Sequence, residues 1–305
     1  MSEADSTIKD VQVALESDSK PSLGISTEDF LRVVRSKLFA PAAFATIALM
    51  FAFWGLLREV PGIWLKNEYY SHGFLVPLIS GYVVYRWWPR IGDTKVKSAP
   101  WGFIFILVSL CFGYVGFLAD TESVQCWAFI FAFWSSILVV AGWDWARKVA
   151  LPVAYLGFAL PTFGTFIEEY TNPMQIISSK VAFEILTLLG FQPMHGDATT
   201  VLLNHYTLDV AAPCSGLKLI VALSSFVVFF MMIGNLRWWA NVLLGLVSLP
   251  LAVFINSLRI SLIGVVVELY GSDAGHKFHD YSGYLTLILC FVLLFQFVRF
   301  LGWKD

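Results

Sequence analysis

Long apolar runs constrain this chain more than any other feature. A helix needs roughly 20 residues to cross about 30 Å of hydrocarbon. Runs near that length lie at residues 39–57, 72–88, 101–119, 124–143, 149–166, 214–234, 238–258 and 284–302. Hydrophobic residues make up 58% of the 305 residues and charged residues only 14%, which excludes an ordinary soluble domain. The sequence therefore predicts an all-α polytopic membrane protein with about eight transmembrane helices.

The distribution of Lys and Arg predicts the orientation of these helices. If residue 1 lies in the cytoplasm, the amino-terminal tail and alternate loops hold 14 of the 20 basic residues. The positive-inside rule then places both termini in the cytoplasm. Residues 1–37 are polar with little apolar periodicity, so we expect a disordered cytoplasmic tail followed by a transmembrane domain at 38–305. A net charge of −2 gives no indication of a nucleic-acid partner.

The longest stretch between predicted spans, residues 167–213, faces outward in this topology. From Pro173 to Gly190 the apolar residues recur at helical spacing, which predicts an amphipathic helix at the outer membrane surface. From Thr199 to Val210 the sequence is β-branched and partly alternating, which predicts a short β-hairpin. Both elements fall between the fifth and sixth spans.

The cysteines give no sign of a metal site or a disulfide framework. Cys111, Cys126 and Cys290 lie inside apolar runs, where cysteine usually acts as a small hydrophobe. No C-x-x-C or Cys/His ligand spacing occurs, so we expect neither a metal nor a cofactor. Cys214 alone has polar neighbours, and it is expected in the first turn of the sixth span, where backbone N–H groups favour a thiolate.

Two further segments contain polar residues that call for an explanation, because ionisable groups at membrane depth are costly. Arg259 lies in an apolar run and shares a helix face with Asn256, three residues before it. His276 and His279 precede the last span. Plainer interpretations are a cysteine that eases helix packing, an arginine that snorkels to the outer surface, and histidines in a solvated loop.

The predicted topology brings these positions to one membrane face. The sixth span starts outside at Cys214, the seventh returns outside near Arg259, and the eighth starts outside after His279. A thiol, a guanidinium and an imidazole at one level suit nucleophilic acyl transfer, in which the cysteine attacks a carbonyl, the histidine moves the proton and a cation stabilises the oxyanion.

At these residues the sequence resembles the exosortase/archaeosortase family of membrane cysteine transpeptidases. The resemblance covers roughly residues 40–300. Its motifs are, in chain order, Tyr70-Ser-His-Gly-Phe-Leu-Val-Pro77, Pro213-Cys-Ser-Gly-Leu217, Asn256-Ser-Leu-Arg-Ile260 and His279-Asp-Tyr-Ser-Gly-Tyr284.

The resemblance implies a catalytic role for three residues, with Cys214 as nucleophile, Arg259 as transition-state stabiliser and His279 as acid/base. Asn256 would orient the histidine or the arginine. His72 would line the substrate path or hold a helix start, and Ser215 would support the nucleophile. Lys218 stands where many members have arginine, which leaves the acceptor or signal preference open.

The resemblance also implies the partners and the location. The substrates would be secreted proteins with a C-terminal sorting tail, which consists of a short motif, often Pro-Glu-Pro-like, a membrane helix and a basic end. The enzyme would lie in a bacterial inner membrane among lipid, with its active site at the outer, periplasmic face and an unidentified acceptor nucleophile. Three alternatives stay open: an intramembrane cysteine endopeptidase, which would use the same residues, a small-molecule transporter and an assembly scaffold. A transporter is disfavoured by the lack of an internal repeat.

Overall fold

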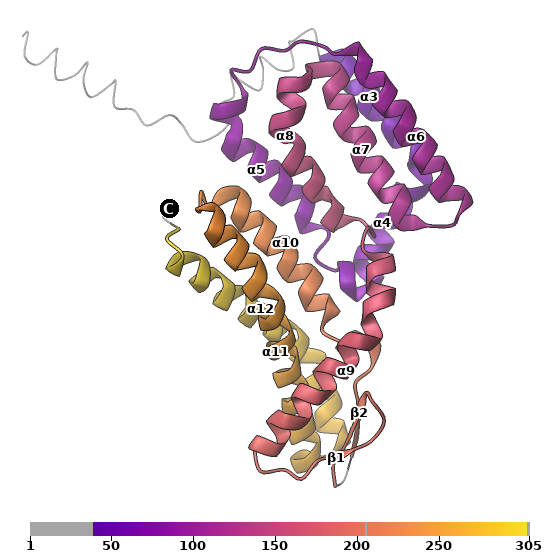
Figure 1. The fold of residues 1–305 in the computed structure, drawn as a ribbon. Helices are drawn as coiled ribbons and strands as arrows, with labels where there is room; N and C mark the ends of the chain where they lie inside the picture. Colours follow the sequence, from indigo (N-terminus) through magenta and orange to yellow (C-terminus); the bar gives the residue numbers. More distant parts are fainter. Residues whose placement is uncertain (1–38, 205, 304–305) are drawn as a thin grey trace, which may run out of the picture.

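The computed structural model describes residues 39–303, apart from residue 205, and it is mainly helical (Figure 1). The tail expected at residues 1–37 lies outside the described residues. The α-helices are α3 (Phe39–Ala52), α4 (Trp54–Lys66), α5 (Leu75–Ile91), α6 (Phe103–Leu118), α7 (Glu122–Ala141), α8 (Trp143–Tyr155), α9 (Gly164–Leu188), α10 (Leu217–Ile233), α11 (Trp238–Tyr270) and α12 (Ser272–Phe300). The 3-10 turns are η1 (Glu68–Tyr70), η2 (Pro100–Gly102), η3 (Leu156–Ala159) and η4 (Ala212–Cys214).

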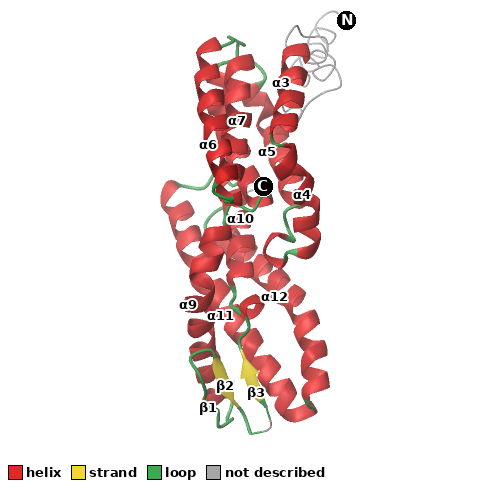
Figure 2. Cartoon of the chain, turned by 90° about the vertical axis from the view of Figure 1, so that its right-hand side faces the viewer, coloured by secondary structure: helices red, strands yellow, loops and turns green. Residues whose placement is uncertain are grey.

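The helices form two groups that α9 joins. Figure 1 shows α3, α5, α6, α7 and α8 in one group and α10, α11 and α12 in the other, with α9 leading to the β-sheet at the far end. The first group has an apolar core from α3, α4, α7 and α8, and the second has its own core around α10. The rotated view in Figure 2 places the sheet at the end of the molecule opposite the start of α3. The molecule is therefore an elongated helical bundle with a small sheet at one end.

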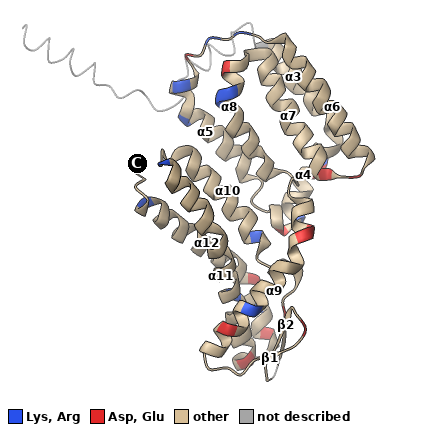
Figure 3. Ribbon diagram, viewed as in Figure 1, with Lys and Arg blue, Asp and Glu red and all other residues tan. Residues whose placement is uncertain are grey.

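Four of the described helices are long and apolar enough to cross a membrane, or six if each of two bent pairs counts as one span. The run at 39–57 forms α3 and α4, which meet at a bend of 77°, and the run at 149–166 is divided between α8 and α9, which meet at 60°. Figure 3 shows that the bodies of α6 and α7 are free of charge between their ends. The chain is thus an all-α membrane protein with four to six candidate spans in the described residues.

The region between α8 and α10 contains both of the expected elements. The predicted amphipathic helix is the second part of the 25-residue α9, which begins before Pro173 and packs along α11. The predicted hairpin consists of β2 (Thr200–Leu202) and β3 (Thr207–Asp209), which pair antiparallel. A third strand, β1 (Met194–His195), pairs with β2 and was not expected.

The last two helices are longer than the apolar pattern predicts. α11 continues to Tyr270, and α12 starts at Ser272, so His279 lies on a helix and not in a loop. Gly271, with φ +86°, makes the only break between the two helices. Gly275 lets them pack closely, because a Cβ there would clash with Cγ2 of Val267. This tight turn carries the polar start of α12 back along α11.

Candidate active site

Cys214 lies just before α10 and not within it. It is the last residue of η4, and α10 starts at Leu217. Between them, Gly216 has φ +89°, a left-handed conformation that ends the turn and starts the helix after the thiol. The expectation that Cys214 occupies the first turn of the sixth helix is therefore wrong. The side chain is 8% exposed and lies in an apolar cluster formed by α9, the sheet and α11.

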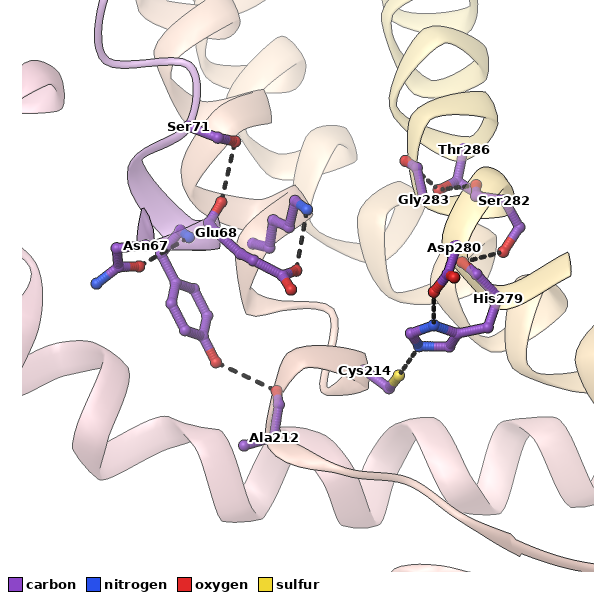
Figure 4. Close-up of polar contacts among 12 residues, drawn as sticks. Asn67, Glu68, Ser71, Ala212, Cys214, His279, Asp280, Ser282, Gly283 and Thr286 are labelled. Atoms are coloured by element: carbon purple, nitrogen blue, oxygen red, sulfur yellow. Dashed lines mark hydrogen bonds and ion pairs between the residues drawn. The ribbon is translucent and has the colours of Figure 1, made fainter. Parts of the chain in front are cut away.

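His279 meets the thiol from α12. Its Nε2 atom lies 3.0 Å from Sγ of Cys214 (Figure 4). Nδ1 of the same ring lies 3.4 Å from Oδ1 of Asp280, a long contact to an exposed carboxylate. Because 40% of the His279 side chain is exposed, a proton on the ring can exchange with solvent. The thiol and the imidazole are thus within direct proton-transfer distance.

Arg259, on α11, lies beside the thiol of Cys214 and the imidazole of His279. Its Nε donates to Oγ of Ser282 at 3.0 Å, and Nη2 donates to the main-chain carbonyl of His279 at 3.1 Å. These two bonds fix the guanidinium beside the thiol–imidazole pair. Nη1 is then left for a further acceptor.

Asn256 has different partners from those expected. Its Nδ2 atom donates to the main-chain carbonyl of Cys214 at 2.7 Å and to Oγ of Ser178 at 3.4 Å. Ser178 in turn donates to the carbonyl of Ser215 at 3.1 Å. The hydroxyl of Ser215 is fully buried and accepts from the N–H of Leu217 at 3.4 Å. The amide therefore holds the nucleophile's main chain and contacts neither the histidine nor the arginine.

The electrostatics of Cys214 differ from the expectation of an easily ionised thiol. Burial raises its pKa above the ordinary value for cysteine, because a thiolate is poorly solvated there. The Arg259 guanidinium opposes this effect and lowers the pKa. Glu68 raises it and Lys218 lowers it, and these two side chains form an ion pair at 3.1 Å. Cys214 therefore needs a base to remove its proton, and His279 is the base within reach.

Two histidines that the sequence singled out do not join this cluster. Nε2 of His72 is buried without a hydrogen-bond partner among the described residues, in the turn before α5. His276 is exposed, and its Nδ1 pairs with the carbonyl of Ser272 on its own helix. Of the two histidines on α12, only His279 reaches the thiol.

A sequence profile for transmembrane exosortases matches residues 64–296, well over half of the chain. The chain belongs to the transmembrane exosortase family. The matched segment runs from α4 to α12, so it contains every residue of the cluster around Cys214. No curated protein and no solved structure matches this exosortase. Membership supports, in general terms, a membrane sorting transpeptidase of the cysteine type.

Several residues around the exosortase site had no signal in the sequence. Ser178 is one of two adjacent serines on α9, and Glu68 lies 150 positions from its partner Lys218. Tyr69 donates its hydroxyl to the carbonyl of Ala212 at 3.2 Å, so η1 also supports the nucleophile turn (Figure 4). Ser282 lies inside the motif His279-Asp-Tyr-Ser-Gly-Tyr284, three residues after His279. This position was the one indication in the sequence that Ser282 belongs to the site. The described residues contain no group of three or more His, Cys, Asp or Glu able to hold a metal ion.

Proposed function

We propose that this exosortase is a cysteine transpeptidase in which Cys214 is the nucleophile, His279 the acid/base and Arg259 the stabiliser of the oxyanion. The observation that carries this proposal is the 3.0 Å separation of Sγ and Nε2. A thiol with a raised pKa is a poor nucleophile until a base takes its proton, and the imidazole lies at hydrogen-bond distance. The substrate would be a secreted protein that ends in a sorting motif, a membrane helix and a basic segment.

The reaction would proceed through a thioester. The thiol proton passes to Nε2 of His279 as Sγ attacks the scissile carbonyl carbon, and the carbonyl oxygen becomes an oxyanion facing Arg259. The C–N bond then breaks, and Nε2–H protonates the departing amine, which releases the tail. An amine, hydroxyl or water next gives its proton to Nε2 and attacks the thioester. The C–S bond breaks and Sγ regains the proton.

Arg259 would act on the oxyanion through the N–H groups that its bonds to Ser282 and His279 leave available. Nε and Nη2 are already used by Ser282 and by the His279 carbonyl, so the guanidinium is oriented before substrate binds. A preorganised donor of this kind is typically worth about 3–4 kcal/mol of barrier. It would also keep the thiolate form accessible, since it opposes the effect of burial.

The topology belongs to the same proposal. Eight crossings, with both termini in the cytoplasm of an inner-membrane host, would put η4 and the start of α12 at the periplasmic face. There a sorting motif would emerge from the bilayer beside Cys214, while the basic end of its tail stays in the cytoplasm. The positive-inside distribution of 14 basic residues supports this orientation.

The test is processing of a co-expressed tailed substrate, measured by mass spectrometry of the product. Cys214→Ala and His279→Ala are expected to abolish cleavage, and Cys111→Ala, at an exposed cysteine of α6, is expected to preserve it. A product that gains only water indicates the endopeptidase alternative, and one that gains an acceptor indicates transfer. Normal processing by Cys214→Ala would refute the assignment and favour the transporter or scaffold alternatives.

A further inference from the structure

Two side chains on one face of α11 each hold the main chain of a reacting residue. Asn256 donates to the carbonyl of Cys214 at 2.7 Å, and Arg259 donates to the carbonyl of His279 at 3.1 Å. The two donors are three positions apart, so they lie on the same helix face one turn apart. Within the described residues, α11 thus bonds to the main chain of both the nucleophile and the base.

Each donor is in turn fixed by a buried serine from another helix. Ser178 of α9 contacts Asn256 at 3.4 Å, and Ser282 of α12 accepts from Nε of Arg259 at 3.0 Å. Asn256 is 1% exposed, Ser178 is fully buried and Ser282 is 3% exposed. Because solvent has little access to the two serines, these contacts favour one orientation of each donor.

The thiol and the imidazole lie on separate elements, so their distance depends on contacts between those elements. Cys214 belongs to a short turn and His279 to a helix, and the two are separated by 65 positions in the chain. Their own contact is one hydrogen bond to sulfur, which is weak. An error of about 1 Å in such a pair can cost about a hundredfold in rate.

We propose that α11 acts as a spacer that sets the separation of Sγ and Nε2, with Asn256 and Ser178 as positioning residues for Cys214. Ser282 is a positioning residue for His279, because its hydroxyl accepts from Nε of Arg259 at 3.0 Å and donates to the carbonyl of His279 at 3.1 Å. This inference rests on the proposed function. It gives Asn256 a role through the nucleophile's main chain, and it gives Arg259 a second role besides oxyanion stabilisation. Gly216 is fitted to the same contact, because a Cβ there would lie 3.0 Å from Nδ2 of Asn256.

The experiment combines processing kinetics with the reactivity of Cys214 in the full-length protein in liposomes. Alkylation of Cys214 by iodoacetamide, located by peptide mass spectrometry, gives a pH profile that depends on the thiol–imidazole contact. The variants are Asn256→Ala, His279→Ala and the double variant, with Ser178→Ala as a milder change. Ser257→Ala is the matched control, because the hydroxyl of this buried serine of α11 donates to the carbonyl of Val253 on its own helix.

We expect Asn256→Ala to lower kcat by roughly 10- to 100-fold with little change in KM. Its alkylation profile should move to that of His279→Ala, and Ser178→Ala should move it in the same direction by less. The alkylation profile of the double variant should match that of His279→Ala, because both changes remove the same contact. Ser257→Ala should behave as wild type.

The outcomes separate the two proposals. If His279→Ala leaves processing and the alkylation profile unchanged, the thiol–imidazole mechanism fails and the spacer fails with it. If His279→Ala alters both while Asn256→Ala and Ser178→Ala keep the wild-type profile, the spacer is wrong and the mechanism stands. Should Asn256→Ala not fold, Ser178→Ala decides between these outcomes.

Discussion

The sulfur of Cys214 lies 3.0 Å from Nε2 of His279, although the two residues belong to a 3-10 turn and to a helix 65 positions away. The thiol is buried and its pKa is raised, whereas the imidazole remains partly open to solvent. This asymmetry favours a neutral thiol that loses its proton during attack. It also makes the reactivity of Cys214 sensitive to the charges that surround it.

Two charged neighbours are expected to shift the ionisation of Cys214 in opposite directions. Glu68 raises the thiol pKa, so Glu68→Gln should lower it and move the alkylation profile towards lower pH. Lys218 lowers the pKa, so Lys218→Met should move the profile towards higher pH. Both shifts should be small, because both side chains are partly exposed and screened by solvent.

The measurement is the rate of Cys214 alkylation as a function of pH, at low and at high salt. Added salt should reduce both shifts. Glu59→Gln is the control, because Glu59 pairs with Arg58 and does not act on the thiol. Shifts of the same sign in the two variants would show that charge is not the cause.

Substitution of Gly216 is expected to abolish processing through a specific contact and not only through backbone strain. Gly216→Ala would add a Cβ 3.0 Å from Nδ2 of Asn256, in a residue with φ +89°. Gly190→Ala is the matched control, because Gly190 has φ +88° but open space around its Cα. Both changes should cost about 1–2 kcal/mol of conformational strain, and only Gly216→Ala should stop cleavage. Equal processing by the two variants would contradict the importance of this contact.

The two histidines of α12 are expected to differ sharply in processing assays. His276→Ala should retain full activity, because His276 is exposed and bonds only to the carbonyl of Ser272. His279→Ala should lose it. Asp280→Ala should reduce the rate by less than about tenfold, because the contact of this carboxylate with Nδ1 is long and exposed. Loss of activity in His276→Ala would mean that the wrong histidine has been assigned.

The orientation of the chain is testable with single cysteines introduced into a variant in which Cys111, Cys126, Cys214 and Cys290 are all alanine. Asp197→Cys, next to the sheet, should react with a membrane-impermeant maleimide in intact spheroplasts. Ser98→Cys, in the exposed loop between α5 and α6, should react only after permeabilisation. We expect the Ser98 loop on the cytoplasmic side because basic residues cluster around Ser98, and such residues remain in the cytoplasm under the positive-inside rule. The reverse labelling pattern would overturn the proposed topology and the periplasmic site.

The apolar pattern was sufficient to predict the class of fold and the order of the elements. Desolvation of backbone groups forces a long apolar run into a helix, so runs such as 101–119 predicted α6 well. The β-branched stretch after Gly190 predicted the hairpin. The pattern could not predict the bend between α3 and α4 or the early start of α12, because polar residues join a helix whenever tertiary packing supports it.

The sequence by itself determined that this chain is a helical membrane protein with a thiol, a guanidinium and an imidazole beside its last three apolar runs. Only the tertiary structure decided that Cys214 precedes its helix, that burial raises the thiol pKa, and that Asn256 holds the nucleophile's carbonyl. The reason is physical. Apolar periodicity is a local property of the chain, whereas hydrogen bonds and desolvation at Cys214 depend on α9, α11 and α12, which reach the thiol from distant parts of the sequence.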